Sequence, residues 1–188
     1  MANTNADNAF MAGSDNDTLY LGPAGTDLSS VTALDSAIPE ALTDCGWITD
    51  DGIIIGFDDS VDKIRGHQGH GVVRTYMSDS STTFKASLIE QKLRLLTDYM
   101  SGESQAAEGG GEVTITAKAS RQVVRMAAVA DMFDVSTGRH RRYVMPIVEL
   151  GERGDQEFQV GSLTVLECNL EIIGDYKLIS NESGLLAG

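Results

Sequence analysis

The sequence predicts a mainly β protein, a β-sandwich or barrel with one flanking α-helix. Most apolar segments after residue 52 alternate with a period of two, as strands do, whereas the segment 89–100 repeats with the period of a helix. That helix is inserted between two groups of strands, about eight strands in all. This order favours a sandwich or barrel with one helix packed on it, formed by a single domain over residues 41–188.

Residues 1–40 are expected to form an acidic, partly flexible N-terminal arm. The first 30 residues are rich in Asn, Asp, Ser, Gly and Ala, and 19–21 (LYL) are able to pair with another strand. The segment CGWITDDGIIIGF, 45–57, then predicts a turn at 50–52 and a strand from Ile53. Trp47 either packs in the core of its own chain or contacts a neighbouring subunit.

The remaining elements follow from local patterns. Short strands are predicted at 61–65, 71–79 and 82–89, the last with Phe84, Ala86 and Leu88 on one face. In the helix over 89–100, one stripe is formed by Ile89, Leu93, Leu96 and Met100, and it is widened by Leu95 and Tyr99.

The second half of the chain opens with a predicted flexible loop at 101–112. A strand is predicted at 112–119, with Val113, Ile115, Ala117 and Ala119 facing inward. Residues 121–130 form either a strand or a short helix, and their β-branched residues favour the strand. A further strand at 141–150 contains Pro146, which indicates an edge strand or a bulge. The clearest strand lies within 165–176, where one face is formed by Leu166, Cys168, Leu170 and Ile172.

Charge is distributed unevenly along the chain, whose formal net charge is −14. Residues 1–62 hold twelve of the 28 Asp and Glu and none of the 14 Lys and Arg. A basic cluster follows later, formed by Lys118, Arg121, Arg125, Arg139, Arg141 and Arg142. These charges either only keep the protein solvated or bind the acidic part of one subunit to the basic part of another. The net negative charge argues against a protein that grips nucleic acid.

No motif of the sequence predicts an enzyme or a cofactor. The chain lacks GxSxG, Walker A and GxGxxG. His67 and His70 lack further metal ligands nearby, and Asp58, Asp59 and Asp62 lack the spacing of a calcium loop.

The chain is expected to be soluble and made in the cytoplasm, because it shows neither a signal peptide nor an apolar stretch long enough to cross a membrane. Cys45 and Cys168 are expected to be buried, reduced thiols.

Several segments, taken in order, carry a resemblance to a known family. They are GWITDDGI (46–53), DKIRGHQGHGVVRT (62–75) and STTFKASLIEQKLRLLTDYM (81–100), with a looser match at RRYVMPIVEL (141–150). Together they resemble the tail tube, or major tail, proteins of bacteriophages with long non-contractile tails (the siphovirus type), particularly those infecting actinobacteria. The resemblance covers about two thirds of the chain, and the first 30 residues lie outside it.

This resemblance implies a structural protein of the virion. Six copies would close into a hexameric ring whose inner strands form a β-barrel, and stacked rings would form the tube for genome delivery. The implied partners are further copies of the chain, the tape-measure protein, and the tail-tip and tail-terminator proteins. Double-stranded DNA would pass through the lumen without specific binding. The implied location is the phage tail, assembled in the host cytoplasm, with no membrane contact.

Charge, exposure and the resemblance together select candidate site residues. The polar face of the late strand, Glu167, Asn169 and Glu171, is predicted to face the lumen. The predicted subunit interface contains Trp47, Asp50, Asp51, Asp58, Asp59, Arg121, Arg125, Arg139, Arg141 and Arg142.

Two other functions stay open: a monomeric β-sandwich binding module or tail-tip accessory protein, and a tube subunit of a phage-derived tail-like or gene-transfer particle. Exposed aromatic side chains would favour the binding module, and neighbouring genes would identify the particle.

Overall fold

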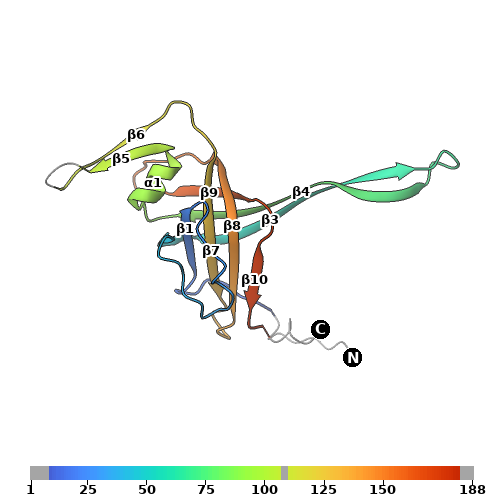
Figure 1. The fold of residues 1–188 in the computed structure, drawn as a ribbon, viewed down its shortest axis with the longest axis horizontal. Helices are drawn as coiled ribbons and strands as arrows, with labels where there is room; N and C mark the ends of the chain where they lie inside the picture. The colour runs from blue at the N-terminus through green and yellow to red at the C-terminus, as the bar shows by residue number, and fades with distance from the viewer. Residues whose placement is uncertain (1–8, 107–109, 183–188) are drawn as a thin grey trace.

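A computed structural model describes residues 9–106 and 110–182. The described part of the chain is mainly β, as predicted, with one short helix (Figure 1). The elements, in chain order, are β1 (Thr18–Pro23), β2 (Thr43–Asp44), β3 (Ile48–Arg65), β4 (Val72–Leu88), α1 (Leu93–Tyr99), β5 (Gly102–Ala106), β6 (Val113–Ala117), β7 (Val124–Phe133), β8 (His140–Arg153), β9 (Leu166–Ile172) and β10 (Lys177–Ser180).

Eight of the strands form one antiparallel sheet that bends over its own core. Its order is β2-β1-β7-β8-β9-β4-β3, with β10 paired to β8, while β5 and β6 form a separate two-stranded sheet. In Figure 1, β1, β7, β8 and β10 run vertically, whereas β9, β4 and β3 cross them. The two halves therefore face each other across the core, an arrangement consistent with a β-sandwich of crossed strands. Within the described residues the sheet is not closed into a barrel, because β2 and β3 are its unjoined ends.

A bulge in β8 makes this bend possible. Met126 of β7 pairs with Val148 and Ala128 with Met145, so Pro146 and Ile147 together face one residue of β7. The bulge predicted from Pro146 is confirmed, although β8 is an interior strand. An inserted residue reverses the faces of a strand. Here it turns Val148 and Leu150 toward the same core as Met145.

The main core lies between the two halves of the sheet. Leu166, Cys168, Leu170 and Ile172 of β9 are buried, which confirms the predicted alternation, and Phe84, Ala86 and Leu88 of β4 are buried against them. Both cysteines are free and buried, as predicted. Burial raises the pKa of the Cys168 thiol to about 12 and raises that of Cys45 further, so both thiols stay neutral.

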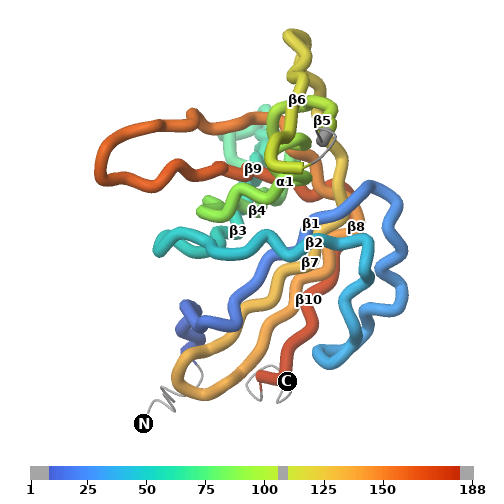
Figure 2. Tube along the Cα trace, turned by 90° about the vertical axis from the view of Figure 1, so that its left-hand side faces the viewer, coloured from blue at the N-terminus to red at the C-terminus, as the bar shows by residue number. Residues whose placement is uncertain are grey.

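A smaller second core covers the outer face of β7. Ala127 and Val129 point away from the main core and pack against Leu28, Val31 and Leu42 of the segment between β1 and β2. Figure 2 shows this segment folded over the sheet. The predicted N-terminal arm thus contributes directly to the domain: β1 pairs with β7, and Leu19 and Leu21 are buried in the main core. Residues 1–8 of the arm lie outside the described residues.

The strands predicted at 53–89 are in fact one long hairpin. β3 and β4 pair from Ile48 and Leu88 outward to Arg65 and Val72. The predicted turn at 50–52 is a bulge inside β3, because Ile48 pairs with Leu88 and Ile53 with Ala86. Four residues of β3 therefore face one residue of β4. The positive φ of Gly52, 69°, allows this detour without steric cost.

The structure corrects the start of the predicted helix and one position of its predicted stripe. α1 begins at Leu93 instead of residue 89, because the Ile89 amide still donates to the Trp47 carbonyl and so extends the strand pairing. Its buried side chains are Leu95 and Tyr99, which belong to the predicted apolar face, whereas Leu93 of the predicted stripe is exposed.

The segment predicted as a flexible loop at 101–112 contains β5, which pairs with β6, and its residues 107–109 lie outside the described residues. Because this small sheet lies apart from the main core, the side chains predicted to face inward are not buried: Val113 is 49% exposed, and neither Ile115 nor Ala117 is buried.

Candidate assembly interface

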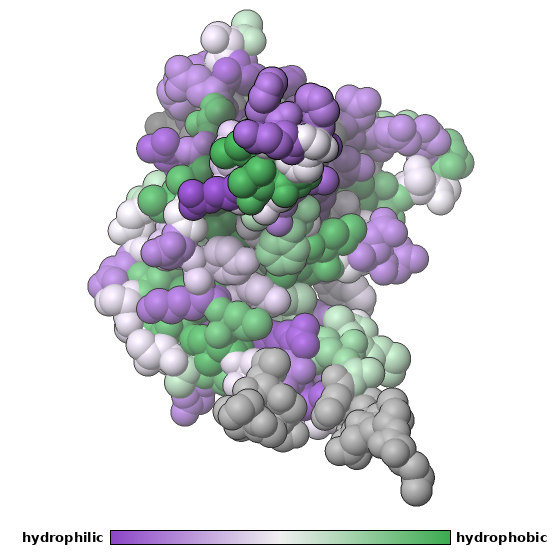
Figure 3. Space-filling model, turned by 90° about the vertical axis from the view of Figure 1, so that its right-hand side faces the viewer, coloured by the Kyte–Doolittle hydropathy of each residue, from purple (hydrophilic) through white to green (hydrophobic). Residues whose placement is uncertain are grey.

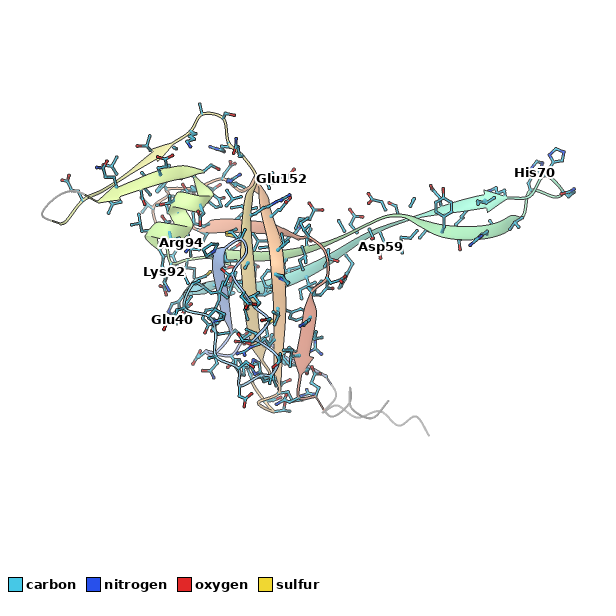
Figure 4. The ribbon with its side chains drawn as sticks, in the orientation of Figure 1. Glu40, Asp59, His70, Lys92, Arg94 and Glu152 are labelled. Atoms are coloured by element: carbon cyan, nitrogen blue, oxygen red, sulfur yellow. The ribbon has the colours of Figure 1, made fainter. Side chains whose placement is uncertain are left out.

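The outer part of the β3–β4 hairpin projects from the domain with nothing packed on it. From residue 57 to residue 80 no side chain is buried. The ribbon of this part extends away from the rest of the domain (Figure 1). At about 3.3 Å per residue, the projecting stem of β3 is roughly 25 Å long. In Figure 4, Asp59 lies on this stem and His70 at its tip. The outer part of the hairpin exposes seven large apolar side chains: Phe57, Val61, Ile64, Val72, Val73, Tyr76 and Met77.

Apolar groups lie on both faces of the hairpin. Phe57 and Val61 share one face of β3, and Met77 lies opposite Val61 on the same face. On the other face, Tyr76 lies opposite Asp62, and its hydroxyl donates to the Asp62 carboxylate at 3.4 Å. The GHQGHG segment forms the tip, with the Gly66 amide donating to the Gly71 carbonyl at 2.9 Å.

Two further projections expose apolar side chains. The β5–β6 hairpin extends from the top of the domain (Figure 1), and the segment between β8 and β9 loops out in Figure 2. This second segment carries Phe158, 81% exposed, together with Val160 and Leu163. Figure 3, viewed with the β3–β4 hairpin directed at the reader, shows hydrophobic side chains among hydrophilic ones across that face. Such exposed apolar groups are typical of surfaces that contact another molecule.

The structure brings three predicted interface residues together beside a groove. Trp47, Asp50 and Asp51 line a groove of about 740 Å³, whose other wall includes the segment from Ala12 to Thr18. Trp47 is 72% exposed, so the interpretation that it packs in the core of its own chain is wrong. Its backbone is nevertheless fixed: the amide donates to Glu90 Oε1 at 3.1 Å, and the carbonyl accepts from the Ile89 amide at 2.9 Å.

The other predicted acidic positions and two of the arginines are also exposed. Asp58 and Asp59 lie on the hairpin stem, away from the groove. Arg121 is exposed in the stretch that leads into β7. The Arg125 side chain, on β7, is 68% exposed and pairs with Glu149 of β8 at 2.6 Å. These groups are accessible to a partner, but the structure does not bring them into one patch.

Arg142 corrects the prediction of an open basic cluster. Its side chain is buried, with Nε 2.7 Å from Asp131 Oδ1 and Nη2 2.8 Å from Asp131 Oδ2. The same guanidinium donates to the carbonyls of Ala33 and Ser36 at 3.2 and 2.8 Å, which holds the segment between β1 and β2 on the sheet. His140 Nε2 lies 2.8 Å from Asp131 Oδ1. A group enclosed in this way stabilises its own subunit and is not available to another.

Arg139 and Arg141 are also engaged within the chain. Arg139 pairs with Asp134 at 3.0 Å, and Arg141 pairs with Glu182 and lies 4.3 Å above the Phe10 ring. Hydrogen bonds from Ser136, Met11 and Thr137 hold the pKa of the Asp134 carboxyl well below its usual range. Arg141 likewise lowers the pKa of Glu182. These contacts join residues near both ends of the described chain to the β7–β8 turn.

The three predicted lumen residues lie together on one face of β9. Glu167, Asn169 and Glu171 alternate with the buried residues, and they lie opposite Ser87, Lys85 and Thr83 of β4. This is the polar face of the crossing half of the sheet. Sequence alternation alone was sufficient to place them on one face.

The described residues contain neither a cluster of metal-ligating side chains nor a membrane-spanning helix. No group of three or more His, Cys, Asp or Glu side chains there is placed to hold a metal ion. Across the same residues, no helix combines the length and the apolar character needed to traverse a bilayer.

The geometry thus describes a mainly β domain with unpartnered projections. No protein-family model matches the chain, and no curated protein is significantly similar to it.

The prominent feature that sequence reasoning missed is the length of the hairpin. A signal for it was present: apolar and β-branched runs of similar length flank the GHQGHG turn, which is the pattern of two paired strands. The intervening Asp and Ser residues divided those runs into apparently separate strands.

Proposed function

We propose that this protein is a self-assembling structural subunit of a phage-type tail tube, in which hexameric rings stack into a conduit for the genome. The observation that carries the proposal is the β3–β4 hairpin, whose outer residues are all accessible in the single chain. An isolated two-stranded hairpin is marginally stable in water, so a hairpin of this length is expected to be held by a partner.

Several features support identical copies as that partner. Among the described residues, β2, β3 and β10 each pair on one side only, and closing sheets around a ring removes such edges. The three projections leave the domain from different places, which is how a subunit contacts neighbours around and along a ring. The segments that resemble tail tube proteins include the outer end of the hairpin, 62–75, and parts of its base.

The polar face of β9 is proposed to line the lumen. Glu167 and Glu171 place negative charge on it, and Lys85 of β4 lies opposite Asn169. A predominantly acidic wall would repel phosphates, so DNA could slide through without binding.

One observation favours a second candidate, the monomeric binding module. Trp47 is exposed beside a groove, and an exposed Trp in a concave site is typical of ligand recognition. This module would remain a monomer at all concentrations.

Negative-stain electron microscopy and sedimentation of the purified, concentrated protein distinguish the two. The tube proposal expects rings or tubes about 100 Å wide, an order-of-magnitude figure for six domains around a pore. A chain that stays monomeric and also fails to join purified tail tips would contradict the tube proposal and favour the module.

A further inference from the structure

The groove beside Trp47 combines an exposed indole, on a backbone held by two hydrogen bonds, with strong negative charge. Its lining residues include six carboxylates and no Lys or Arg. Three of these carboxylates accept hydrogen bonds within the chain, those of Asp17, Asp44 and Glu90. Lys92 compensates part of the charge from beside the groove, with Nζ 3.9 Å from Asp44 and 3.7 Å from Glu90. Asp15, Asp50 and Asp51 make no ion pair with any described residue.

The groove wall also carries an unmet hydrogen bond. Thr49 lines the groove, and its Oγ1 is shielded from solvent without a hydrogen-bond partner among the described residues. Exposed Trp side chains near the centre of a concave surface commonly carry much of the energy of an interface. A cation placed over an indole face gains further from the π-system. The groove is therefore suited to a segment that is cationic and partly apolar.

The outer end of the β3–β4 hairpin, residues 63–74, has that character. It contains Lys63, Arg65 and Arg74 and no Asp or Glu, in the chain whose net charge is −14. Ile64, Val72 and Val73 lie between these cations, 51%, 47% and 72% exposed. The Arg65 guanidinium donates to the His70 carbonyl at 3.2 Å within the tip, and no described acid pairs with any of the three cations.

The hairpin cannot fill the groove of its own chain, because it projects away from the domain (Figure 1). We infer that the acidic groove beside Trp47 receives the cationic hairpin end, residues 63–74, of a second copy of this chain. This inference rests on the proposed self-assembly and identifies one of its contacts. The groove of one copy then contacts the hairpin end of another copy, which is the head-to-tail geometry that generates rings or filaments. Charge complementarity selects the hairpin end and orients it in the groove.

Trp47 reports on this contact directly, because it is the only Trp in the chain. As the protein assembles with rising concentration, its fluorescence should shift to shorter wavelength and iodide should quench it less. The hairpin variant K63E/R65E/R74E and the groove variant D50R/D51R should each raise the apparent dissociation constant for assembly about 10-fold or more. The control K177E reverses an exposed cation outside the hairpin, the groove and the predicted interface, and it should keep the Trp47 signal.

Mixing the two variants gives the sharpest result. Each variant reverses one side of the contact, so the mixture should assemble where neither does alone. If the wild-type chain sediments as an assembly while Trp47 stays exposed, or if both variants assemble normally, this inference is overturned and the proposed function stands. If the wild-type chain neither assembles nor changes its Trp47 signal, both are overturned.

Discussion

At the scale of single residues, the buried charge cluster around Asp131 holds Arg142 and His140 inside the subunit. Its carboxylate accepts two hydrogen bonds from Arg142 and contacts His140, whose ring stacks on Phe133 at 4.0 Å. A buried ion pair contributes little over an apolar core, but removing one partner leaves the other charged and unpaired. Three of the arginines that suggested an external docking surface, Arg139, Arg141 and Arg142, therefore act inside the subunit.

We predict that R142A destabilises the chain by about 3–5 kcal/mol, because Asp131 would remain buried without its main partner and the segment between β1 and β2 would lose two hydrogen bonds. Urea unfolding followed by circular dichroism measures this change. The exposed pair provides the control: R125A should cost no more than about 1 kcal/mol. Similar values for the two variants would contradict the assignment.

Asp134 predicts a dependence of stability on pH. Because hydrogen bonds hold its pKa below the usual value in the folded chain, its contribution is present above about pH 4 and lost as the pH falls further. D134N should therefore be less stable than the wild type at pH 7, and its free energy of unfolding should fall less between pH 7 and pH 3. D59N, at an exposed position on the hairpin stem, should behave like the wild type. Equal pH dependence in D134N and wild type would refute the role of Asp134.

At the scale of elements, the β3–β4 hairpin has two parts with different roles. The inner part, up to Phe57 and Thr82, pairs with β9 through β4 and supplies Phe84, Ala86 and Leu88 to the core. The outer part supplies no buried side chain. Changes in the inner part, up to Phe57, should therefore affect stability, whereas changes beyond Phe57 should affect assembly.

We predict that replacing residues 58–81 by Asn-Gly, a pair suited to a two-residue hairpin turn, leaves the fold intact and abolishes assembly. The free energy of unfolding should change by no more than about 1 kcal/mol, because little apolar area of the outer part is buried in the single chain. Circular dichroism and sedimentation measure the two effects. The variant V61S/M77S keeps the full length of the hairpin and replaces two of its apolar side chains. It therefore tests whether the apolar face itself is needed for assembly. Normal assembly of the shortened chain would contradict the proposed role.

At the scale of the whole molecule, one bent sheet encloses the main core, while an irregular segment covers its outer face. β8 pairs with β10 along its first half and with β9 along its second, on either side of the Pro146 bulge. β8 thus pairs with strands of both crossing halves and connects them. The unpaired edges at β2 and β3 and the three projections remain for contacts beyond the single chain.

The sequence by itself determined that the chain is mainly β, the alternation of β4 and β9 and the burial of both cysteines, and it limited Pro146 to an edge strand or a bulge. These features depend on side-chain polarity and local backbone constraints, which a period of two or a proline reveals directly. The three polar residues of β9 share one face for the same reason.

Only the tertiary structure decided which charges are external and which apolar groups are free. Arg142 and Arg125 look alike in sequence, yet one is enclosed by Asp131 and two carbonyls while the other lies at the surface. Likewise, Phe57 and Phe84 lie on one hairpin, but only Phe84 meets the core. The reason is physical: burial depends on which distant segments pack together, and no local pattern contains that information.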